Sequence, residues 1–226
     1  MNMNFVKKNK NRGFTLLELL IVIAIIAILS VALVLVLNPA ETLKKARDAQ
    51  RISDLNTIKT AIGLYMTTVA PVYLGGTSSN AECQAVTGTW AGTNKIFYSL
   101  PVASVITDVV LDGVGGALKL QVATPSLTDS TGWIPVDFGN IAGGSPISKI
   151  PVDPINTITA LGAVASTDLV YRYGCAQSPL AFEIDAQLES IAYTVTTDMR
   201  ATDGGNNAGV YEDGTDLLIF GTGADF

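Results

Sequence analysis

The sequence contains no histidine, only two cysteines and only 15% charged residues. The absence of histidine excludes Ser-His and Cys-His nucleophilic sites, and it removes a ligand that most zinc sites use. The chain also lacks a phosphate-binding glycine loop and a nucleotide-binding fingerprint. We therefore expect that this protein is not an enzyme.

Charge is scarce and unevenly distributed. Lys7, Lys8, Lys10 and Arg12 lie in the first 13 residues with no acidic residue among them, whereas the net charge of the whole chain is −6. The remainder of the chain is therefore acidic. An acidic surface argues against nucleic-acid binding, because contact with phosphates needs clustered Lys and Arg.

A long apolar run, Phe14–Leu37, follows the basic residues and is interrupted only by Thr15, Glu18 and Ser30. The run is long enough to span a bilayer as a helix. A cleaved secretory signal would have a shorter apolar core and a small-residue cleavage site after it. The basic residues before the run favour a cytoplasmic N-terminus, which places the rest of the chain outside the cytoplasm.

Glu18 is the one acidic residue in this run. A carboxylate in hydrocarbon is unfavourable, so it marks a position that has a partner. The run contains no Lys or Arg, but cleavage after Gly13 would leave Phe14 with a cationic amine. In a bundle of staggered copies, that amine can pair with Glu18 of a neighbour. Such a pair fixes register more surely than it adds stability.

The segment RGFTLLELLIVIAIIAIL resembles the N-terminal signature of type IV pilins and type II secretion pseudopilins. The resemblance implies that a prepilin peptidase cleaves between Gly13 and Phe14, that Phe14 becomes N-methylated, and that Glu18 acts in assembly. It also implies that an inner-membrane assembly platform builds identical or related subunits into a helical filament. The alternative is a signal-anchored membrane protein in which the acid is incidental.

A further helical segment is expected after the apolar run. Asn38 and Pro39 are typical of an N-cap and a first helical residue, and Glu41 follows as an acid in the first turn. Lys44 and Asp48 are expected to pair on the wet side of this helix. Apolar residues recur at three- and four-residue steps, which indicates an amphipathic helix. They are Ile52, Leu55, Ile58, Ile62, Tyr65 and Val69.

The remainder is rich in Gly, Thr, Ser and Pro and contains short apolar runs that predict strands. They are Lys95–Leu100, Leu118–Ala123, Leu169–Tyr173, Leu180–Ala186 and Leu217–Phe220. In LAFEIDAQ the residue types alternate, so Phe182 and Ile184 should face a core while Glu183 and Asp185 face water. The long loops are expected to face outward and to carry recognition. They cover residues 71–95 and 125–160.

These features predict an α+β fold of the pilin type. A long N-terminal helix, apolar in its first half and amphipathic in its second, would pack on an antiparallel β-sheet. The expected divisions are a cleaved basic leader (1–13), the long helix (14–69, with 14–37 as transmembrane segment and filament core) and a β-rich head domain (70–226).

Cys83 and Cys175 are the two cysteines. If most of the chain is exported, a disulfide between them is expected, because such bonds form and persist outside the cytoplasm. Two buried thiols are the alternative.

The stretch ATDGGNNAGVYEDGTDL gathers oxygen-bearing side chains in a glycine-rich loop near the C-terminus. Hard oxygen ligands of this kind suit calcium, which some pseudopilins bind in a C-terminal loop. The spacing does not match an EF-hand, and a solvated acidic turn is the alternative. The candidate ligands are Asp203, Asn206, Glu212, Asp213 and Asp216. No cofactor other than calcium is suggested.

The sequence thus predicts a structural filament subunit of a type IV pilus or a type II secretion pseudopilus. Before assembly it would be a single-pass protein of the cytoplasmic membrane with its head outside the cytoplasm, and afterwards part of a periplasmic or extracellular filament. Two alternatives remain. One is a minor subunit at the filament tip whose loops bind a ligand, a surface or DNA, and the other is a monomeric, signal-anchored binding domain.

Overall fold

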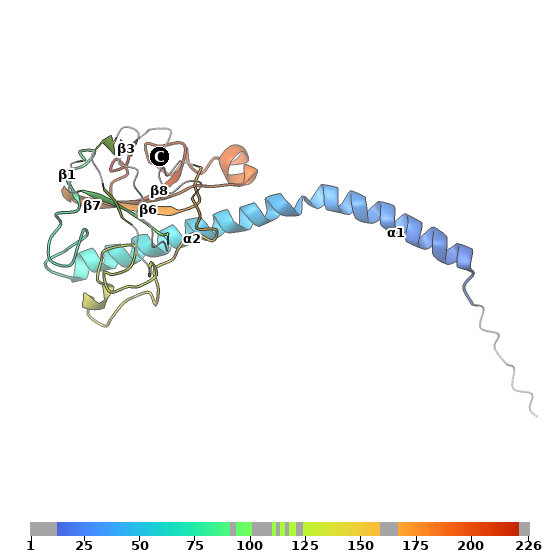
Figure 1. Cartoon of the computed structure of the whole chain (residues 1–226), viewed down its shortest axis with the longest axis horizontal. Coiled ribbons are helices and arrows are strands. Elements are labelled where there is room, and N and C mark those ends of the chain that lie inside the picture. Colours follow the sequence, from blue (N-terminus) through green and yellow to red (C-terminus); the bar gives the residue numbers. More distant parts are fainter. Residues whose placement is uncertain are drawn as a thin grey trace, which may run out of the picture. The chain divides into compact units, whose positions relative to one another are not determined.

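The computed structural model describes residues 13–90, 94–100, 110–111, 114–115, 118–120, 124–158 and 167–221. The chain divides into two compact units, Met1–Thr42 and Leu43–Phe226. The first unit contains helix α1 (Leu16–Leu37). The second unit, called the head below, contains most of helix α2 (Pro39–Thr68) and the β-sheet (Figure 1).

Asn38 separates α1 from α2. Its backbone is left-handed, with φ at 39°, a conformation that asparagine tolerates better than most residues. The Asn38 N–H donates to the carbonyl of Val34 at 3.3 Å, and its side-chain oxygen accepts the N–H of Glu41 at 3.4 Å. Pro39 is the first residue of α2. The predicted helix start at residues 38–41 is therefore confirmed.

Helix α2 carries the predicted apolar stripe into the core of the head. Leu55, Ile58, Ile62 and Tyr65 are all buried. Figure 1 shows this helix running between the sheet and the segment 124–158. The core therefore takes apolar side chains from both. They are Phe97, Tyr171, Tyr173, Phe182 and Ile184 from the sheet, and Trp133, Ile134, Val136, Phe138, Ile141 and Ile150 from the segment.

The prediction that the loop 125–160 faces outward is therefore wrong for the residues that enter the core, whereas residues 142–149 are exposed or half-buried. Its regular structure in the described part is one short 3-10 helix, η1 (Phe138–Asn140). The segment nevertheless packs against α2, and the indole N–H of Trp133 donates to the carbonyl of Pro151 at 2.8 Å. Apolar residues without periodicity can still form core when the backbone is held by such local bonds.

The sheet is made of β1 (Gln84–Val86), β2 (Lys95–Tyr98), β5 (Leu118–Leu120), β6 (Tyr171–Ser178), β7 (Leu180–Ala186) and β8 (Tyr211–Gly214). Its strand order is β5-β2-β6-β7-β8, and β1 pairs separately with β6. Antiparallel pairs join β2 to β6, β6 to β7 and β7 to β8, whereas β2–β5 and β1–β6 are parallel. The predicted antiparallel sheet is thus confirmed at its centre but is mixed overall. A separate pair joins β3 (Val110–Leu111) to β4 (Val114–Gly115).

The predicted strands agree with the structure most closely at β7, which has the predicted bounds. Strand β6 begins two residues later than predicted and continues to Ser178. The segment Leu217–Phe220 is not a strand. The backbone N–H groups of Ile219 and Phe220 donate to the carboxylate of Glu183 rather than to a neighbouring strand. The residues of Leu118–Ala123 beyond Leu120 lie outside the described part.

The second face of the sheet, opposite the core that contains α2, is shielded from solvent. The prediction that Glu183 and Asp185 face water is therefore wrong. Both side chains are fully buried. Ile219 and Phe220 cover this face, where Phe220 packs with Ile96 and Tyr98 and Ile219 packs with Ala176 and Ala181. Alternation along β7 predicted the direction of its side chains correctly, but it carried no information about what covers the second face.

Cys83 and Cys175 form the predicted disulfide, with an S–S distance of 2.05 Å across 92 residues of sequence. The bond joins the start of the β1 region to the middle of β6. Gly75 lies directly against it, because a Cβ added there would lie 2.6 Å from the sulfur of Cys83. Since no other residue lacks a Cβ, glycine is required at this position.

Candidate processing and assembly site

The residues predicted to be processed lie at the start of α1. Gly13 and Phe14 precede the helix, and Phe14 is 93% exposed. A side chain added at Gly13 would meet no described atom of the chain within 4 Å. Nothing in the described part of the chain therefore covers the Gly13–Phe14 bond. A larger residue at 13 would not disturb the fold of the subunit.

Thr15 and Glu18 form a reciprocal capping box at the start of α1. The Thr15 N–H and hydroxyl both donate to Oε2 of Glu18, at 2.8 and 2.9 Å, and the Glu18 N–H donates to the Thr15 hydroxyl at 3.2 Å. The box satisfies N–H groups that the helix start leaves unpaired, and it places an anion where the helix dipole favours one. Glu18 therefore has local donors within its own chain.

Sequence reasoning about Glu18 missed the role of Thr15, although the signal was present. Thr15-Leu-Leu-Glu18 has the spacing of a capping box, in which Ser or Thr precedes Glu or Gln by three residues. A carboxylate has four acceptor positions in its two oxygens, and both donors from Thr15 use Oε2. The capping box and a further cationic partner for Glu18 are therefore chemically compatible.

The remainder of α1 presents apolar side chains on all sides. Every large apolar residue described on it is exposed, from Leu16 at 82% to Ile21 at 48%. Ser30 donates its hydroxyl to the carbonyl of Ile26 at 2.7 Å, so its hydrogen-bond donor is satisfied within the helix. Among the described residues, this is the one helical stretch long and apolar enough to cross a membrane. An exposed apolar surface of this size indicates a membrane or a protein interface.

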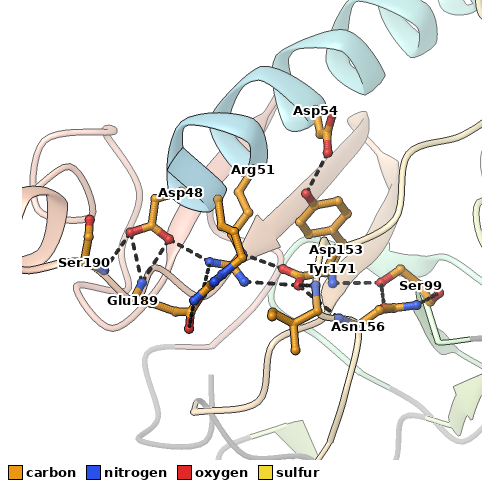
Figure 2. Close-up of polar contacts among 11 residues, drawn as sticks. Asp48, Arg51, Asp54, Ser99, Asp153, Asn156, Tyr171, Glu189 and Ser190 are labelled. Carbon is orange, nitrogen blue, oxygen red and sulfur yellow. Dashed lines mark hydrogen bonds and ion pairs between the residues drawn. The ribbon is translucent and has the colours of Figure 1, made fainter. Parts of the chain in front are cut away.

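The amphipathic helix is fixed in the head by a buried cluster of charges (Figure 2). At its centre lies Arg51, whose side chain is fully buried. The guanidinium donates twice to Asp153, at 2.6 and 3.1 Å, and it also donates to Asp48 at 2.7 Å and to Glu189 at 2.8 Å. Arg47 donates to Glu189 as well, at 2.9 and 3.1 Å. We call these five residues the Arg51 cluster.

The carboxylates of this cluster also hold backbone segments. Asp48 accepts the N–H groups of Glu189 and Ser190, the latter at 2.7 Å. Asp153 accepts the N–H groups of the two loop residues at positions 155 and 156. The prediction that Asp48 pairs with Lys44 on the wet side is therefore wrong, because Asp48 is buried and serves as the anchor of the 189–190 turn.

The electrostatics of the cluster favour the charged forms of Arg51 and Glu189. Burial lowers the pKa of Arg51, but its hydrogen bonds and its attraction to Asp153, with further hydrogen bonds to Glu189 and Asp48, outweigh burial and raise the pKa. Burial raises the pKa of Glu189, but the bonds from Arg47 and Arg51 outweigh it, and the net shift is downward. Arg51 and Glu189 therefore remain ionised at neutral pH.

A second polar chain lies beside the Arg51 cluster in Figure 2. The hydroxyl of Tyr171 donates to Asp54 at 2.9 Å, and the N–H of Tyr171 donates to the hydroxyl of Ser99 at 3.0 Å. Ser99 in turn donates to the side chain of Asn156 at 2.7 Å. Burial raises the pKa of Asp54, although the bond from Tyr171 opposes the shift. These contacts join α2, β6 and two loops.

The five candidate calcium ligands separate into different contacts. Asp213 accepts from the ammonium of Lys59 at 2.6 Å, and Asp216 accepts from the hydroxyl of Thr87 at 2.8 Å. The side-chain amide of Asn206 donates to the carbonyl of Phe220 at 3.4 Å.

Asp203 and Glu212 are adjacent, but they bind protein donors. Asp203 accepts the N–H of Glu212 at 2.8 Å, and Glu212 accepts the N–H of Asn207 at 2.8 Å. In the described part of the chain, no three Asp, Glu or Cys side chains are arranged to hold a metal ion. The five residues predicted from sequence therefore do not converge on one point in the described structure, because their side chains are held in separate contacts.

Comparison with known proteins finds similarity at one end of the chain. Residues 8–34 match the family model described as the prokaryotic N-terminal methylation motif, and this range includes Gly13, Phe14, Thr15 and Glu18. No curated protein and no solved structure matches the chain. The chain therefore carries, at its N-terminus, the signature of type IV pilin and pseudopilin precursors.

Proposed function

We propose that this protein is a structural subunit of a type IV pilus-like or type II secretion pseudopilus filament. The observation that carries the proposal is the methylation motif at residues 8–34, which includes most of helix α1, a helix that exposes apolar side chains on all sides. A prepilin peptidase would cleave between Gly13 and Phe14. The helix would then lie in the membrane before assembly and in the filament core afterwards.

Assembly would proceed through the new end of the chain. Cleavage converts the Phe14 nitrogen into a cationic amine, and Glu18 of a neighbouring subunit supplies the opposite charge. Thr15 holds Oε2 of Glu18 and leaves further acceptor positions on the carboxylate for the incoming amine. In a poorly screened environment, an unpaired carboxylate is disfavoured, so the pair selects the register in which both charges are satisfied.

The partners of the subunit would be copies of itself or related subunits, the peptidase, the membrane and an inner-membrane assembly platform. The head would lie outside the cytoplasm, where its disulfide is stable. No catalytic role is proposed for the head. The Arg51 cluster and the disulfide serve to keep its helix, sheet and loops together.

The test is to express Glu18→Ala and to count filaments by electron microscopy while intact mass identifies the membrane-resident form. The substitution removes an unfavourable carboxylate from the membrane, so insertion and cleavage should continue. We expect mature protein that begins at residue 14 to accumulate in the membrane, with few or no filaments. Glu41→Ala is the matched control, because it removes an acid from the first turn of α2 without touching the apolar run.

Abundant filaments of normal symmetry in Glu18→Ala would show that Glu18 is not the assembly contact. A wild-type chain that keeps its leader in the membrane would contradict the proposal as a whole. The second outcome would instead support a monomeric, signal-anchored domain.

A further inference from the structure

The second face of the sheet buries an excess of negative charge. Glu183 and Asp185 lie two residues apart on β7, and Glu212 of β8 is the cross-strand partner of Asp185. All three side chains are buried, and Glu183 is within hydrogen-bonding reach of Glu212. Arg172 of β6 donates to Asp185 at 2.5 Å and is the cation that faces them in the described structure.

The two glutamates are satisfied on one oxygen each. Oε2 of Glu183 accepts the N–H groups of Ile219 and Phe220 at 2.8 and 2.9 Å, and Oε2 of Glu212 accepts the N–H of Asn207 at 2.8 Å. The other oxygen, Oε1, is buried in both residues and has no hydrogen-bond partner among the described atoms. Two ionised carboxylates in contact would repel each other and leave both of these acceptors unpaired.

We propose that Glu183 and Glu212 share one proton in the folded head. The proton lies between the two Oε1 atoms, so one residue is a carboxylic acid that donates and the other is a carboxylate that accepts. This arrangement pairs both orphaned oxygens and removes one of the buried negative charges. The shared proton thereby stabilises the contact between β7 and the C-terminal segment 217–220, whose backbone Glu183 binds.

The groups that face this pair act in both directions. Arg172 is attractive, and the ring of Phe220 lies 6.0 Å from its guanidinium carbon. Asp185 on β7 and Asp203 in the loop before β8 add negative charge near the pair. Tyr98 of β2 lies beside Arg172 in the strand register and brings a neutral hydroxyl. The summed charge of these neighbours is negative, which favours retention of a proton by the pair.

The expected titration agrees with this geometry. Burial raises the pKa of Glu183 well above its usual range, and contact with Glu212 raises it further. Burial also raises the pKa of Glu212. Burial raises the pKa of Asp185 to about 6 against the opposing effect of Arg172. Above pH 6.5 Asp185 is therefore mostly ionised in both the folded and unfolded states, and the glutamate pair is the group on this face that still releases a proton.

The sign of the pH dependence follows. In the unfolded chain both glutamates lose their protons near pH 4.3, whereas the folded head keeps one proton to higher pH. The folded state thus binds more protons, so its stability is greatest below about pH 4.3 for this pair and falls as pH rises. One retained proton increases the unfolding equilibrium constant about tenfold per pH unit until the folded pair itself titrates.

The experiment is urea unfolding of the full-length chain in non-ionic detergent micelles between pH 6.5 and 8.5. Tryptophan fluorescence reports the head alone, because both tryptophans of the chain, Trp90 and Trp133, belong to it, and Trp90 stacks on Phe220. We compare the wild type with Glu183→Gln. Glutamine can accept from Ile219 and Phe220 and donate to Glu212, so it imitates the protonated pair.

In the wild type, we expect the unfolding equilibrium constant to rise about tenfold per pH unit because of the retained proton, and we expect Glu183→Gln to lack this rise. The variant should therefore be more stable than the wild type at pH 8.5. Glu212→Gln should behave in the same way and keeps the test decisive if the first variant fails to fold. Glu82→Gln, at a carboxylate that pairs with Lys95, is the matched control and should keep the wild-type dependence.

Two outcomes would overturn the proposal. One is an unchanged pH dependence in both Glu183→Gln and Glu212→Gln. The other is a rise in the urea midpoint of the wild type on addition of calcium chloride at pH 8.5 that Glu183→Gln abolishes, because the two carboxylates would then hold a cation in place of a proton.

Discussion

Helix α1 and the head arrange polar and apolar groups in opposite ways. On α1 the apolar side chains face outward, and its two polar residues, Glu18 and Ser30, find hydrogen-bond partners within four positions of themselves. In the head the apolar side chains are inside, and buried charges such as Arg51 find partners more than 100 residues away. The first region needs an external apolar environment, whereas the second supplies its own.

This contrast separates two kinds of stability. The capping box keeps its form wherever the first turn of α1 is helical, because all its members lie within four residues. The Arg51 cluster exists only when α2, the loop at 153 and the turn at 189 are assembled together. Substitutions near α1 should therefore change processing and assembly and leave the stability of the head unaltered, while substitutions in the head should do the reverse.

The largest effect is expected at the cleavage point. Gly13→Val adds a branched side chain where the described chain leaves open space, so neither the helix nor the head should be disturbed. Recognition by the peptidase should fail, and essentially all of the protein should keep its leader. Intact mass of the membrane fraction measures this outcome. Normal processing of the variant would disprove the predicted cleavage point.

The next effect tests the head alone. Arg51→Met removes the guanidinium and leaves Asp48, Asp153 and Glu189 near one another without their shared cation. Breaking a buried pair in this way destabilises a protein by about 3–5 kcal/mol. We expect a loss of that size in urea unfolding of the full-length chain, followed by tryptophan fluorescence.

The control for this substitution is Arg47→Met, which removes a more exposed guanidinium from the same Glu189. Because Arg51 remains to pair with Glu189, the loss should be clearly smaller. Equal losses in the two variants would mean that burial does not decide the strength of this cluster. Cleavage after Gly13 should continue in both variants.

A smaller effect is expected where the C-terminal segment covers the sheet. A Cβ at Gly174 would lie 2.9 Å from the ring of Phe220, so Gly174→Ala should force that ring to move. Overpacking of this kind costs about 1–3 kcal/mol. Gly63→Ala in α2 is the matched control, because open space surrounds that position and alanine should stabilise the helix by about 0.5–1 kcal/mol. Urea midpoints that move in the same direction would contradict the predicted close packing.

The same contrast explains how far the sequence could predict the molecule. The apolar run, the helix start at Asn38–Pro39 and the stripe on α2 are patterns within a few residues, and they were predicted correctly. Strand β7 has the predicted bounds for the same reason. The capping box could also have been recognised, since its two residues lie three apart.

What the sequence could not supply is the identity of distant partners. Glu183 was predicted to face solvent because alternation describes the side chains of one strand and not the segment that packs over them. That segment includes residues 219 and 220. Nor could the sequence show that the candidate calcium ligands do not converge, because the partners of Asp213 and Asp216 are Lys59 and Thr87, far away in sequence. An acidic composition does not reveal which oxygens are already bonded.

The smallest loss of stability is expected for a substitution of Lys59, and it tests whether burial decides the strength of an ion pair. Lys59 pairs with Asp213 at 2.6 Å, as close as any contact of Arg51, but its side chain is 46% exposed. Water can therefore replace the ammonium in Lys59→Met, while Asp213 keeps the N–H of Gly214. Exposed pairs contribute about 0–1 kcal/mol, so urea unfolding should show a loss below about 1 kcal/mol. At 1 M salt the Debye length falls to about 3 Å, and the difference from the wild type should shrink further. A loss as large as that of Arg51→Met, unaffected by salt, would mean that the short distance between the charges decides the strength of these pairs, and not their burial.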